Sequence, residues 1–306
     1  MSLDGPVVVL AGGTGGAKLA RGMLDVVGAD DLVVIANTGD DIEIYGGHVS
    51  PDPDLITFWL ADRIDERGWG LRDDTFSVMD GLRELGVEVW FNLGDRDLAI
   101  AIERSRSLDE GARLTEAHAR ICASLGVRAR VLPMADTPVR TRVMADGTWF
   151  SLQEFLIRRR GEGPIQDIDF RHARAATPTP EVLEAIATAR AIVIGPSNPV
   201  ISIGPILAVP GMTDALTQSS AAVVAVSPLV GGRVLKGPTE ACLRWAGHNA
   251  SSAGIAEIYA GVIDGLVADD RTRAVTVLET SVLMDDADAR SRLAGQTLQF
   301  AQGLRK

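Results

Sequence analysis

The sequence predicts an α/β fold: a doubly wound, Rossmann-like and mostly parallel sheet, with a largely helical insertion that contains a β-hairpin. Three observations support this fold class. Apolar runs alternate with helical patterns near both ends of the 306-residue chain. The runs are continuous, as strands buried on both faces require. The first run breaks into clustered glycines that lead into a helical pattern, which is typical of a strand, a tight turn and a helix start.

The predicted core comprises residues 1–50 and 175–306. Its first strand, Val7–Ala11, is followed by a helix near 17–27 and by a second strand, Leu32–Ala36. Later apolar runs at 191–195, 221–227 and about 263–267 predict three more strands, with helical stretches between them. This βαβ alternation is the pattern of a parallel sheet covered by helices on both faces.

The middle of the chain, residues 51–174, reads as the insertion. Helical patterns occupy 54–67, 74–85, 98–105 and 114–125. Two short runs at 139–145 and 148–152 flank Asp146-Gly147, a dipeptide that favours a β-hairpin turn. A charged helix then ends in Arg158–Arg160, before Gly161 and Pro164.

Composition limits the class of protein. Apolar residues make up 46% of the chain and charged residues 23%, as in folded globular proteins. A net charge of −11 argues against nucleic acid as a partner, because no basic excess displaces counterions. The N-terminal residues show no signal-peptide pattern, and no apolar stretch approaches the ~20 residues that span a bilayer. Two cysteines without a CxxC spacing fit a reducing compartment. We therefore expect a cytoplasmic protein with no membrane partner.

The glycine-rich turn after the first strand is the strongest candidate for binding a phosphate group. It contains Gly12, Gly13, Thr14 and Gly15, with Lys18 shortly after. Backbone N–H groups at a helix start bind phosphate well. The turn lacks the Gly-Lys-Ser/Thr of a Walker A loop, and Lys18 stands where a dinucleotide fingerprint has its third glycine. The alternative is a turn that only packs a helix against a strand.

Four carboxylates fall within fifteen residues just after the second strand: Asp40, Asp41, Asp52 and Asp54. Such groups repel one another unless a positive charge lies between them. Mg²⁺, held by Asp41 and Asp54, is the simplest solution beside a phosphate-binding turn. Two other interpretations remain open, because Asp54 is also placed to cap a helix and Asp40 to bind a ribose hydroxyl.

Further polar loops follow other strands, so we expect them at the same edge of the sheet, as in a nucleotide cleft. Asn37 ends the second strand, and Asn92 precedes Leu93-Gly94-Asp95-Arg96-Asp97, which is either a ligand-facing segment or a capped helix start with a local salt bridge. The remaining candidates in these loops are Ser197, Asn198, Ser227, Gly231 and Gly232.

Taken together, these segments resemble the 2-phospho-L-lactate transferases of coenzyme F420 biosynthesis. The resemblance runs nearly from end to end, and the segments occur in order and at matching separations. Besides the glycine turn with Lys18 and the Asn37-Thr38 turn that leads to Asp41, they are Ser50-Pro51-Asp52-Pro53-Asp54, Trp69-Gly70, Asp74-Thr75-Phe76, Leu93–Asp97, Gly195–Pro199, Ser202–Ile206 and Val226-Ser227-Pro228.

The resemblance implies a reaction and two substrates. A guanosine diphosphate adduct of a small phospho-acid donates its phospho-acid portion to the deazaflavin alcohol Fo, and GMP is released. It implies that Asp54 contacts Fo, that the insertion forms part of the deazaflavin site, and that Asn92 replaces a lysine found at an Fo-contacting position in some members. It also implies a guanine nucleotide site along Gly12–Gly15, Ser197-Asn198 and Ser227–Gly232. Pro53 and Trp59 depart from the family's usual leucine and tyrosine.

From this chemistry we expect a phosphoryl-type transfer with little covalent work for the protein. Mg²⁺, Lys18 and backbone amides would neutralise the diphosphate, with Asp41 and Asp54 as catalytic residues. Asp54 is either a metal ligand or the group that accepts the proton of the attacking hydroxyl. The alternative function is a non-enzymatic regulatory protein of related fold that binds a nucleotide sugar. The sequence leaves open lactate, enolpyruvate or glycerate as the acid, and its apolar content is compatible with a homodimer.

Overall fold

The computed structural model describes residues 5–304. Its centre is a seven-stranded sheet in which every neighbouring pair of strands is parallel, in the order β14-β13-β10-β9-β1-β2-β5. In chain order the strands are β1 (Val7–Ala11), β2 (Leu32–Ala36), β5 (Arg130–Pro133), β9 (Ala191–Ile194), β10 (Val223–Val226), β13 (Gly265–Ala268) and β14 (Thr276–Glu279).

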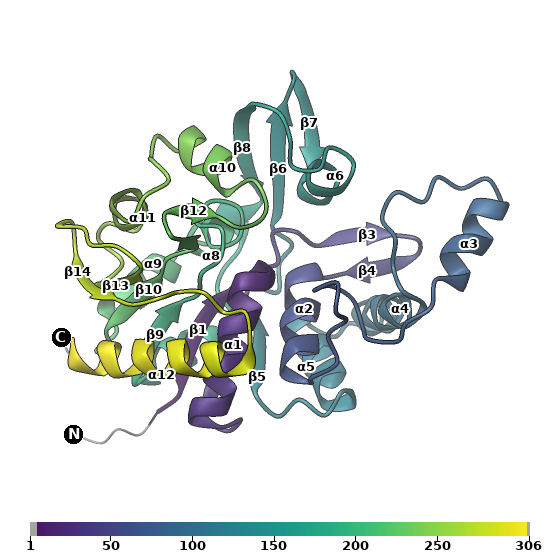
Figure 1. The fold of residues 1–306 in the computed structure, drawn as a ribbon. Helices are drawn as coiled ribbons and strands as arrows, with labels where there is room; N and C mark the ends of the chain where they lie inside the picture. Colours follow the sequence, from purple (N-terminus) through teal and green to yellow (C-terminus); the bar gives the residue numbers. More distant parts are fainter. Residues whose placement is uncertain (1–4, 305–306) are drawn as a thin grey trace.

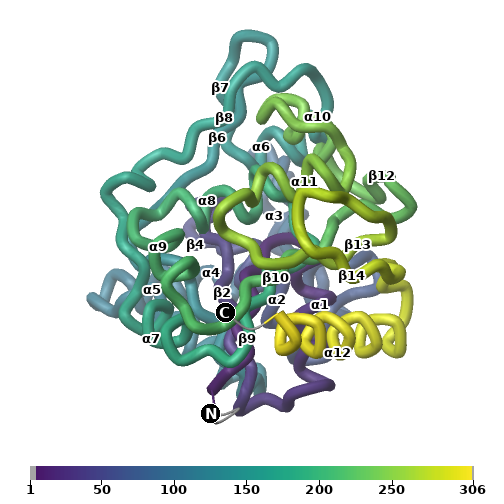
Figure 2. Tube along the Cα trace, turned by 90° about the vertical axis from the view of Figure 1, so that its left-hand side faces the viewer, coloured from purple at the N-terminus to yellow at the C-terminus, as the bar shows by residue number. Residues whose placement is uncertain are grey.

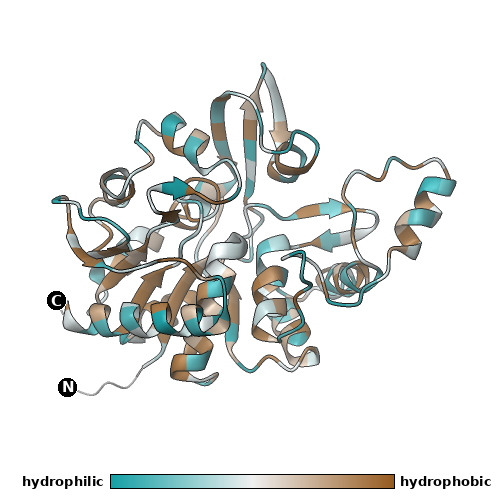
Figure 3. Ribbon diagram, in the orientation of Figure 1, coloured by the Kyte–Doolittle hydropathy of each residue, from teal (hydrophilic) through white to brown (hydrophobic). Residues whose placement is uncertain are grey.

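Helices cover both faces of this sheet (Figure 1), and alternate residues of β1 pack into separate cores. Val8 and Leu10 face one core, whereas Val7 and Val9 face the other. The inner strands β1, β2, β9 and β10 are mainly brown in Figure 3, because apolar residues are buried on both sides. The first core is closed by α7 (Pro180–Thr188), α8 (Gly204–Leu207), α9 (Met212–Gln218) and α11 (Ser252–Ile258), and the second by α1 (Gly13–Val27), α2 (Pro51–Leu60), α5 (Leu114–Ser124) and α12 (Ala287–Gly303). Helix α12 packs against α1, and the two lie next to each other in Figure 2.

The strand order reverses between β1 and β9, which creates the crevice where ligands bind in doubly wound sheets. From β1 the chain proceeds outward to β2 and β5, and then returns to β9 on the other side. The glycine turn follows β1 and the Gly195–Asn198 loop follows β9. The fold therefore brings two of the predicted polar loops to one place.

Two small units project from the central layers (Figure 1). The first, which we call the hairpin lobe, combines β3 (Ile42–Ile44) and β4 (Gly47–Val49) with α3 (Ser77–Glu84) and α4 (Asp95–Asp109) around its own apolar cluster. The second, which we call the small sheet, is antiparallel in the order β7-β6-β8 and has its own apolar cluster. It consists of β6 (Arg140–Ala145), β7 (Thr148–Ser151) and β8 (Ile165–Arg171), with α6 (Leu152–Ile157) and α10 (Thr239–Trp245) packed on it. A 3-10 turn at Ala173–Ala175 and the short hairpin of β11 (Leu229–Val230) and β12 (Arg233–Val234) complete the elements.

The predicted α/β class, the parallel sheet and the hairpin around Asp146-Gly147 are confirmed. Several details differ from expectation. The first helix begins at Gly13, so the glycines form its first turn, and the helix expected over 54–67 starts at Pro51 and ends at Leu60. The division at 51–174 stays a prediction, although α2, α5 and β5 from that range belong to the central layers. Within residues 5–304, no helix is long and apolar enough to cross a membrane.

Candidate functional site

The glycine turn and the loop after β9 pack directly against each other. The backbone N–H of Gly12 donates to Ser197 Oγ at 3.2 Å. A Cβ atom on Gly15 would lie 2.2 Å from the carbonyl oxygen of Pro196, so only glycine fits there. Gly13 has φ +63°, a conformation that favours glycine at the helix start. The absence of side chains is therefore what lets the two loops meet at the β1–β9 crevice.

The carboxylate of Asp52 ties the start of α2 to this turn. Its Oδ1 accepts a hydrogen bond from the N–H of Gly13 at 2.6 Å, and its Oδ2 accepts one from Asn37 Nδ2 at 2.8 Å. Burial raises the pKa of Asp52 to about 6, with the Asp41 charge adding to it, although the bonds from Asn37 and Gly13 oppose the shift. Asp52 thus places carboxylate charge at the N-terminus of α1, where helix dipoles favour anions.

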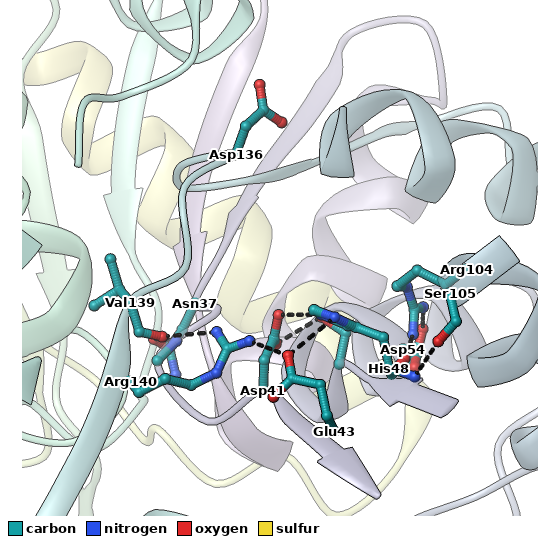
Figure 4. A network of polar contacts seen from close by, with 12 residues as sticks. Asn37, Asp41, Glu43, His48, Asp54, Arg104, Ser105, Asp136, Val139 and Arg140 are labelled. Atoms are coloured by element: carbon teal, nitrogen blue, oxygen red, sulfur yellow. Dashed lines mark hydrogen bonds and ion pairs between the residues drawn. The ribbon is translucent and has the colours of Figure 1, made fainter. Parts of the chain in front are cut away.

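Asp41 lies in a chain of alternating charges that Figure 4 shows from close by. Its Oδ1 accepts a hydrogen bond from Ser50 Oγ at 2.6 Å, and its Oδ2 lies 3.0 Å from His48 Nε2. The other ring nitrogen of His48 lies 3.3 Å from Glu43, which in turn pairs with Arg140 at 2.7 Å. Burial lowers the pKa of His48, but the contacts with Asp41 and Glu43 outweigh it and raise that pKa to about 9. His48 is therefore a cation at neutral pH.

Asp54 forms an ion pair with Arg104 of α4, whose side chain is completely buried. The pair uses Oδ1 of Asp54 and Nη2 of Arg104, and Nη1 of Arg104 donates to the carbonyl oxygen of His48 at 2.8 Å. Burial raises the pKa of Asp54, and Arg104 opposes that shift. One buried arginine thus joins α4 of the hairpin lobe to Asp54 on α2 and to His48 on β4.

Two further carboxylates, Asp40 and Asp97, are short of compensating charge. Asp40 Oδ2 accepts a hydrogen bond from Gln153 at 3.1 Å, whereas its buried Oδ1 has no hydrogen-bond partner among the described residues. Burial, followed by repulsion from Asp52 and Asp41, raises the pKa of Asp40 well above its usual range. Burial and the nearby Asp54 charge raise the pKa of Asp97 to about 7.

The segment 93–97 is a helix start, as one of its two interpretations predicts. Helices α3 and α4 cap each other: an aspartate before α3 caps α4, and an aspartate at the start of α4 caps α3. Asp74 accepts hydrogen bonds from the N–H groups of Arg96 and Asp97 in the first turn of α4. Asp95 in turn accepts from Thr75 Oγ1 and from the first N–H groups of α3. These two aspartates hold the starts of α3 and α4 together in the hairpin lobe.

Other predicted residues have mainly local partners. Lys18 Nζ donates to the carbonyl oxygen of Met284 at 3.0 Å, and Asn92 accepts from Arg83 at 2.7 Å. Asn198 caps the turn that follows it by accepting from Val200 and Ile201. The rest lie as follows: Thr14 in the first turn of α1, Ser227 Oγ accepting from Leu229, and Gly231 and Gly232 in the exposed β11–β12 turn, where the Gly231 N–H donates to Asp269.

The predicted metal ligands, Asp41 and Asp54, already have positively charged partners in the structure. Within residues 5–304, no three His, Cys, Asp or Glu side chains are grouped as a preformed metal site. His48 and Arg104 already neutralise Asp41 and Asp54 in part. Mg²⁺ nevertheless commonly uses only one or two carboxylates together with substrate phosphates. The unpartnered oxygen of Asp40 and the raised pKa values of Asp40 and Asp52 fit a cluster that could hold a cation.

Sequence reasoning gave no role to Arg104. Asp97, Ala101 and Arg104 recur at helical spacing, and Leu98 and Ala101 are buried. An arginine on the buried face of a predicted helix is therefore a signal that such reasoning could use, because a buried charge needs a partner. Nothing in the sequence names Asp54 as that partner.

Comparison with known proteins identifies the family. The family model described as 2-phospho-L-lactate transferase CofD matches residues 7–295. The chain belongs to this family. It is 39% identical over 269 residues to the 2-phospho-L-lactate transferase of Methanosarcina mazei, which covers 88% of each chain. It is also 39% identical to the phosphoenolpyruvate transferase of Streptomyces griseus, over 98% of this chain and 99% of the relative. Family membership makes the chain an enzyme, a transferase associated with F420 biosynthesis, and disfavours the regulatory alternative.

A solved structure supports the fold independently. Protein BH3568 from Bacillus halodurans superposes with a TM-score of 0.65 over 96% of this chain and 100% of that chain. The two sequences are 18% identical, so the likeness extends to the fold alone.

Proposed function

We propose that this transferase moves a phospho-acid group from a guanosine diphosphate adduct to the deazaflavin alcohol Fo and releases GMP. The observation that carries the proposal is the junction at the β1–β9 crevice. There the first turn of α1, Asn37 and the carboxylate of Asp52 meet in one hydrogen-bonded unit. This unit joins a phosphate-binding turn to an acidic cluster, which is what transfer between a diphosphate and an alcohol requires.

The nucleotide would lie along the helix start, with its phosphates toward the N–H groups that follow Gly13 in the first turn of α1, since the N–H groups of Gly12 and Gly13 already donate to Ser197 and Asp52. Helix N-termini favour anions, and the protein's net charge of −11 makes such local donors necessary. The guanine moiety would lie toward Ser197, Asn198 and the β11–β12 turn, as the family resemblance implies. Fo would approach from the side of Asp54 and the hairpin lobe.

We also propose Mg²⁺ as the cation that completes the acidic cluster. Asp41 and Asp54 are the predicted ligands, and Asp40 adds an oxygen without a hydrogen-bond partner among residues 5–304. When bound, the ion would neutralise charge on the diphosphate oxygens. His48 and Arg104 fix the orientations of the two predicted ligands through their ion pairs.

The reaction then needs few covalent steps. A ribityl hydroxyl oxygen of Fo attacks the phosphorus that bears the phospho-acid, and the bond from this phosphorus to the oxygen of GMP breaks. Asp54 either holds the metal ion or accepts the hydroxyl proton, and burial favours the second role because it raises the pKa of that carboxyl. The N–H groups of the first turn of α1 would hold the departing phosphate. Catalysis is thus mainly positioning and charge neutralisation.

Replacing Asp54 with Asn tests the role of this residue. If it accepts the proton, Asp54→Asn abolishes turnover with each donor, while the dissociation constant for GDP changes less than about twofold. A parallel loss of Mg²⁺-dependent GDP binding would instead assign Asp54 to the metal. The matched control is Asp80→Asn, because Asp80 is an exposed residue in the hairpin lobe that pairs with Arg83.

The acceptor is tested by titrating the purified protein with Fo and following its fluorescence, with and without Mg²⁺ and GDP. Saturable binding that responds to GDP or Mg²⁺ supports the proposal. Absence of binding under every condition contradicts it. Turnover assays with the lactate, enolpyruvate and glycerate donors then identify the phospho-acid.

A further inference from the structure

A buried polar cluster joins α2 to α5 close to the candidate site. It consists of Thr57 on α2 together with His118 and Cys122 on α5, which lie one helical turn apart and so share a face of that helix. Thr57 and His118 are completely buried. Apolar side chains could fill this space without the cost of taking polar groups out of water. Buried polar networks hold their members in one arrangement, so this cluster points to a group whose orientation matters.

The hydroxyl group of Thr57 is the centre of the cluster. Its Oγ1 donates to the carbonyl oxygen of Pro53 at 2.8 Å. The same oxygen lies 3.1 Å from Nε2 of His118 and 3.6 Å from Sγ of Cys122. The hydroxyl has one hydrogen, and a carbonyl oxygen can only accept. With that hydrogen directed to Pro53, the imidazole and the thiol donate to the hydroxyl oxygen.

His118 is a neutral imidazole that carries its hydrogen on Nε2. Burial, and then the charge of Arg104, lower the pKa of His118 to about 3. Its other ring nitrogen, Nδ1, is buried and has no hydrogen-bond partner within residues 5–304. A hydrogen on Nδ1 would be an unpaired buried donor near the Arg104 cation, whereas a lone pair is favourable there. The imidazole therefore donates through Nε2 to Thr57.

The carbonyl group that Thr57 holds belongs to the peptide between Pro53 and Asp54. The proline ring fixes φ of Pro53, so ψ of that residue sets the direction of this peptide. The hydrogen bond from Thr57 restrains that angle. At the other end of the residue, the Asp54 carboxylate pairs with Arg104. Asp54 is thus held twice, at its backbone by α5 and at its carboxylate by α4.

We infer that Thr57 and His118 are positioning residues, which orient the Asp54 carboxylate through the backbone of α2. The inference rests on the proposed function, in which Asp54 holds the metal ion or accepts the hydroxyl proton, and it applies to both roles. Helix α5 packs in the core of the central layers, so the cluster refers the position of Asp54 to the sheet and not to the hairpin lobe. A misplacement of about 1 Å in a catalytic group costs about 100-fold in rate.

Substitutions at Thr57 test the inference. Valine has the shape of threonine but cannot donate to Pro53, whereas serine retains the hydroxyl group. We expect Thr57→Val to lower kcat by about 10- to 100-fold, while the dissociation constant for GDP changes less than about twofold. Thr57→Ser should recover most of the lost kcat. A purely structural role would lower the unfolding midpoint but leave kcat of the folded protein unchanged.

Two variants at His118 and one control complete the series. His118→Gln keeps a side-chain N–H that can donate to Thr57, so it should retain more of kcat than His118→Leu. The control is Thr188→Val, because Thr188 is an exposed residue of α7 whose hydroxyl makes the same type of bond, to the carbonyl oxygen of Glu184 at 2.8 Å. It should leave kcat unchanged. Circular dichroism of each variant confirms that the measured protein is folded.

A second readout does not need turnover. The ¹³C chemical shift of the Asp54 carboxyl, assigned by its loss in Asp54→Asn, should move in Thr57→Val and return toward the wild-type value in Thr57→Ser. An unchanged shift in Thr57→Val would overturn the inference. Wild-type kcat in folded Thr57→Val, or a serine variant no more active than the valine variant, would also overturn it. If the wild type turns over no donor, the proposed function fails, and the carboxyl shift still decides whether the cluster orients Asp54.

Discussion

The ion pair between Arg104 and Asp54 should be among the most stabilising contacts of the hairpin lobe, and Arg104→Met tests this. The arginine side chain is fully buried, and its two terminal nitrogens serve Asp54 and the carbonyl oxygen of His48. Methionine retains much of the volume but leaves a buried carboxylate and a carbonyl without partners. Removing one partner of a buried ion pair costs about 3–5 kcal/mol. We therefore expect the free energy of unfolding to fall by about that amount.

Urea unfolding of four metal-free proteins measures this: the wild type, Arg104→Met, Asp54→Asn and the double variant. Each single variant leaves one buried group uncompensated, whereas the double variant leaves no unpaired charge. The double variant should thus lose less than the sum of the singles, with a coupling energy of about 2 kcal/mol or more. Arg106→Met, two residues further along α4 and exposed, is the control and should leave the unfolding midpoint unchanged. A loss below about 1 kcal/mol for Arg104→Met, or additive losses, would refute the reasoning, because that is the range of a solvent-exposed pair.

Two further predictions concern pH and the glycine turn. The pKa of His48 is raised from 6.5 to about 9, so its stabilising contribution is fully present below pH 6.5 and is lost as pH rises through about 9. In EDTA, the wild type should lose up to about 3 kcal/mol of unfolding free energy over this range, and His48→Gln should show a flatter profile; parallel profiles would contradict the assigned cation. Gly15→Ala would bring a Cβ to 2.2 Å from the Pro196 carbonyl oxygen, so calorimetry should show GDP affinity falling at least about tenfold. The control is Gly81→Ala, whose Cβ would have no neighbour within 4 Å, and it should bind GDP as the wild type does. If both variants bind GDP normally, the glycine turn is not part of the nucleotide site.

The sequence predicted the central strands well because burial on both faces leaves a local signal. Val7–Ala11 and Leu32–Ala36 are continuous apolar runs, and both have the expected bounds. Strand β5 was not predicted, because it is only four residues long at the sheet edge, begins with an exposed arginine and ends in proline. Strand β8 was not predicted either, since its charged residues alternate on a half-exposed antiparallel sheet. Local patterns therefore fail where a strand depends on its neighbour for burial.

In the candidate site, too, local features could be predicted from the sequence and long-range contacts could not. The glycine turn and the loop at Ser197 could be found from the sequence because each depends on residues within one turn, and their meeting follows from the strand order. The pairing of Asp54 with Arg104 spans fifty residues and depends on how α4 packs against β4. No local pattern encodes that distance. For the candidate site, sequence reasoning therefore lacked the contacts between elements.

These contacts also change what a metal ion would do in the site. The four clustered aspartates led us to expect one cation between Asp41 and Asp54, yet the protein itself supplies His48 to the first and Arg104 to the second. The remaining two, Asp40 and Asp52, have carboxyl pKa values raised by burial and by neighbouring carboxylates. A divalent cation would relieve most repulsion beside those two, since ion pairs with His48 and Arg104 already stabilise the other two. Mg²⁺ binding should therefore release protons below about pH 6, where Asp52 is protonated in the metal-free protein, and a buffer-dependent binding enthalpy would detect this release.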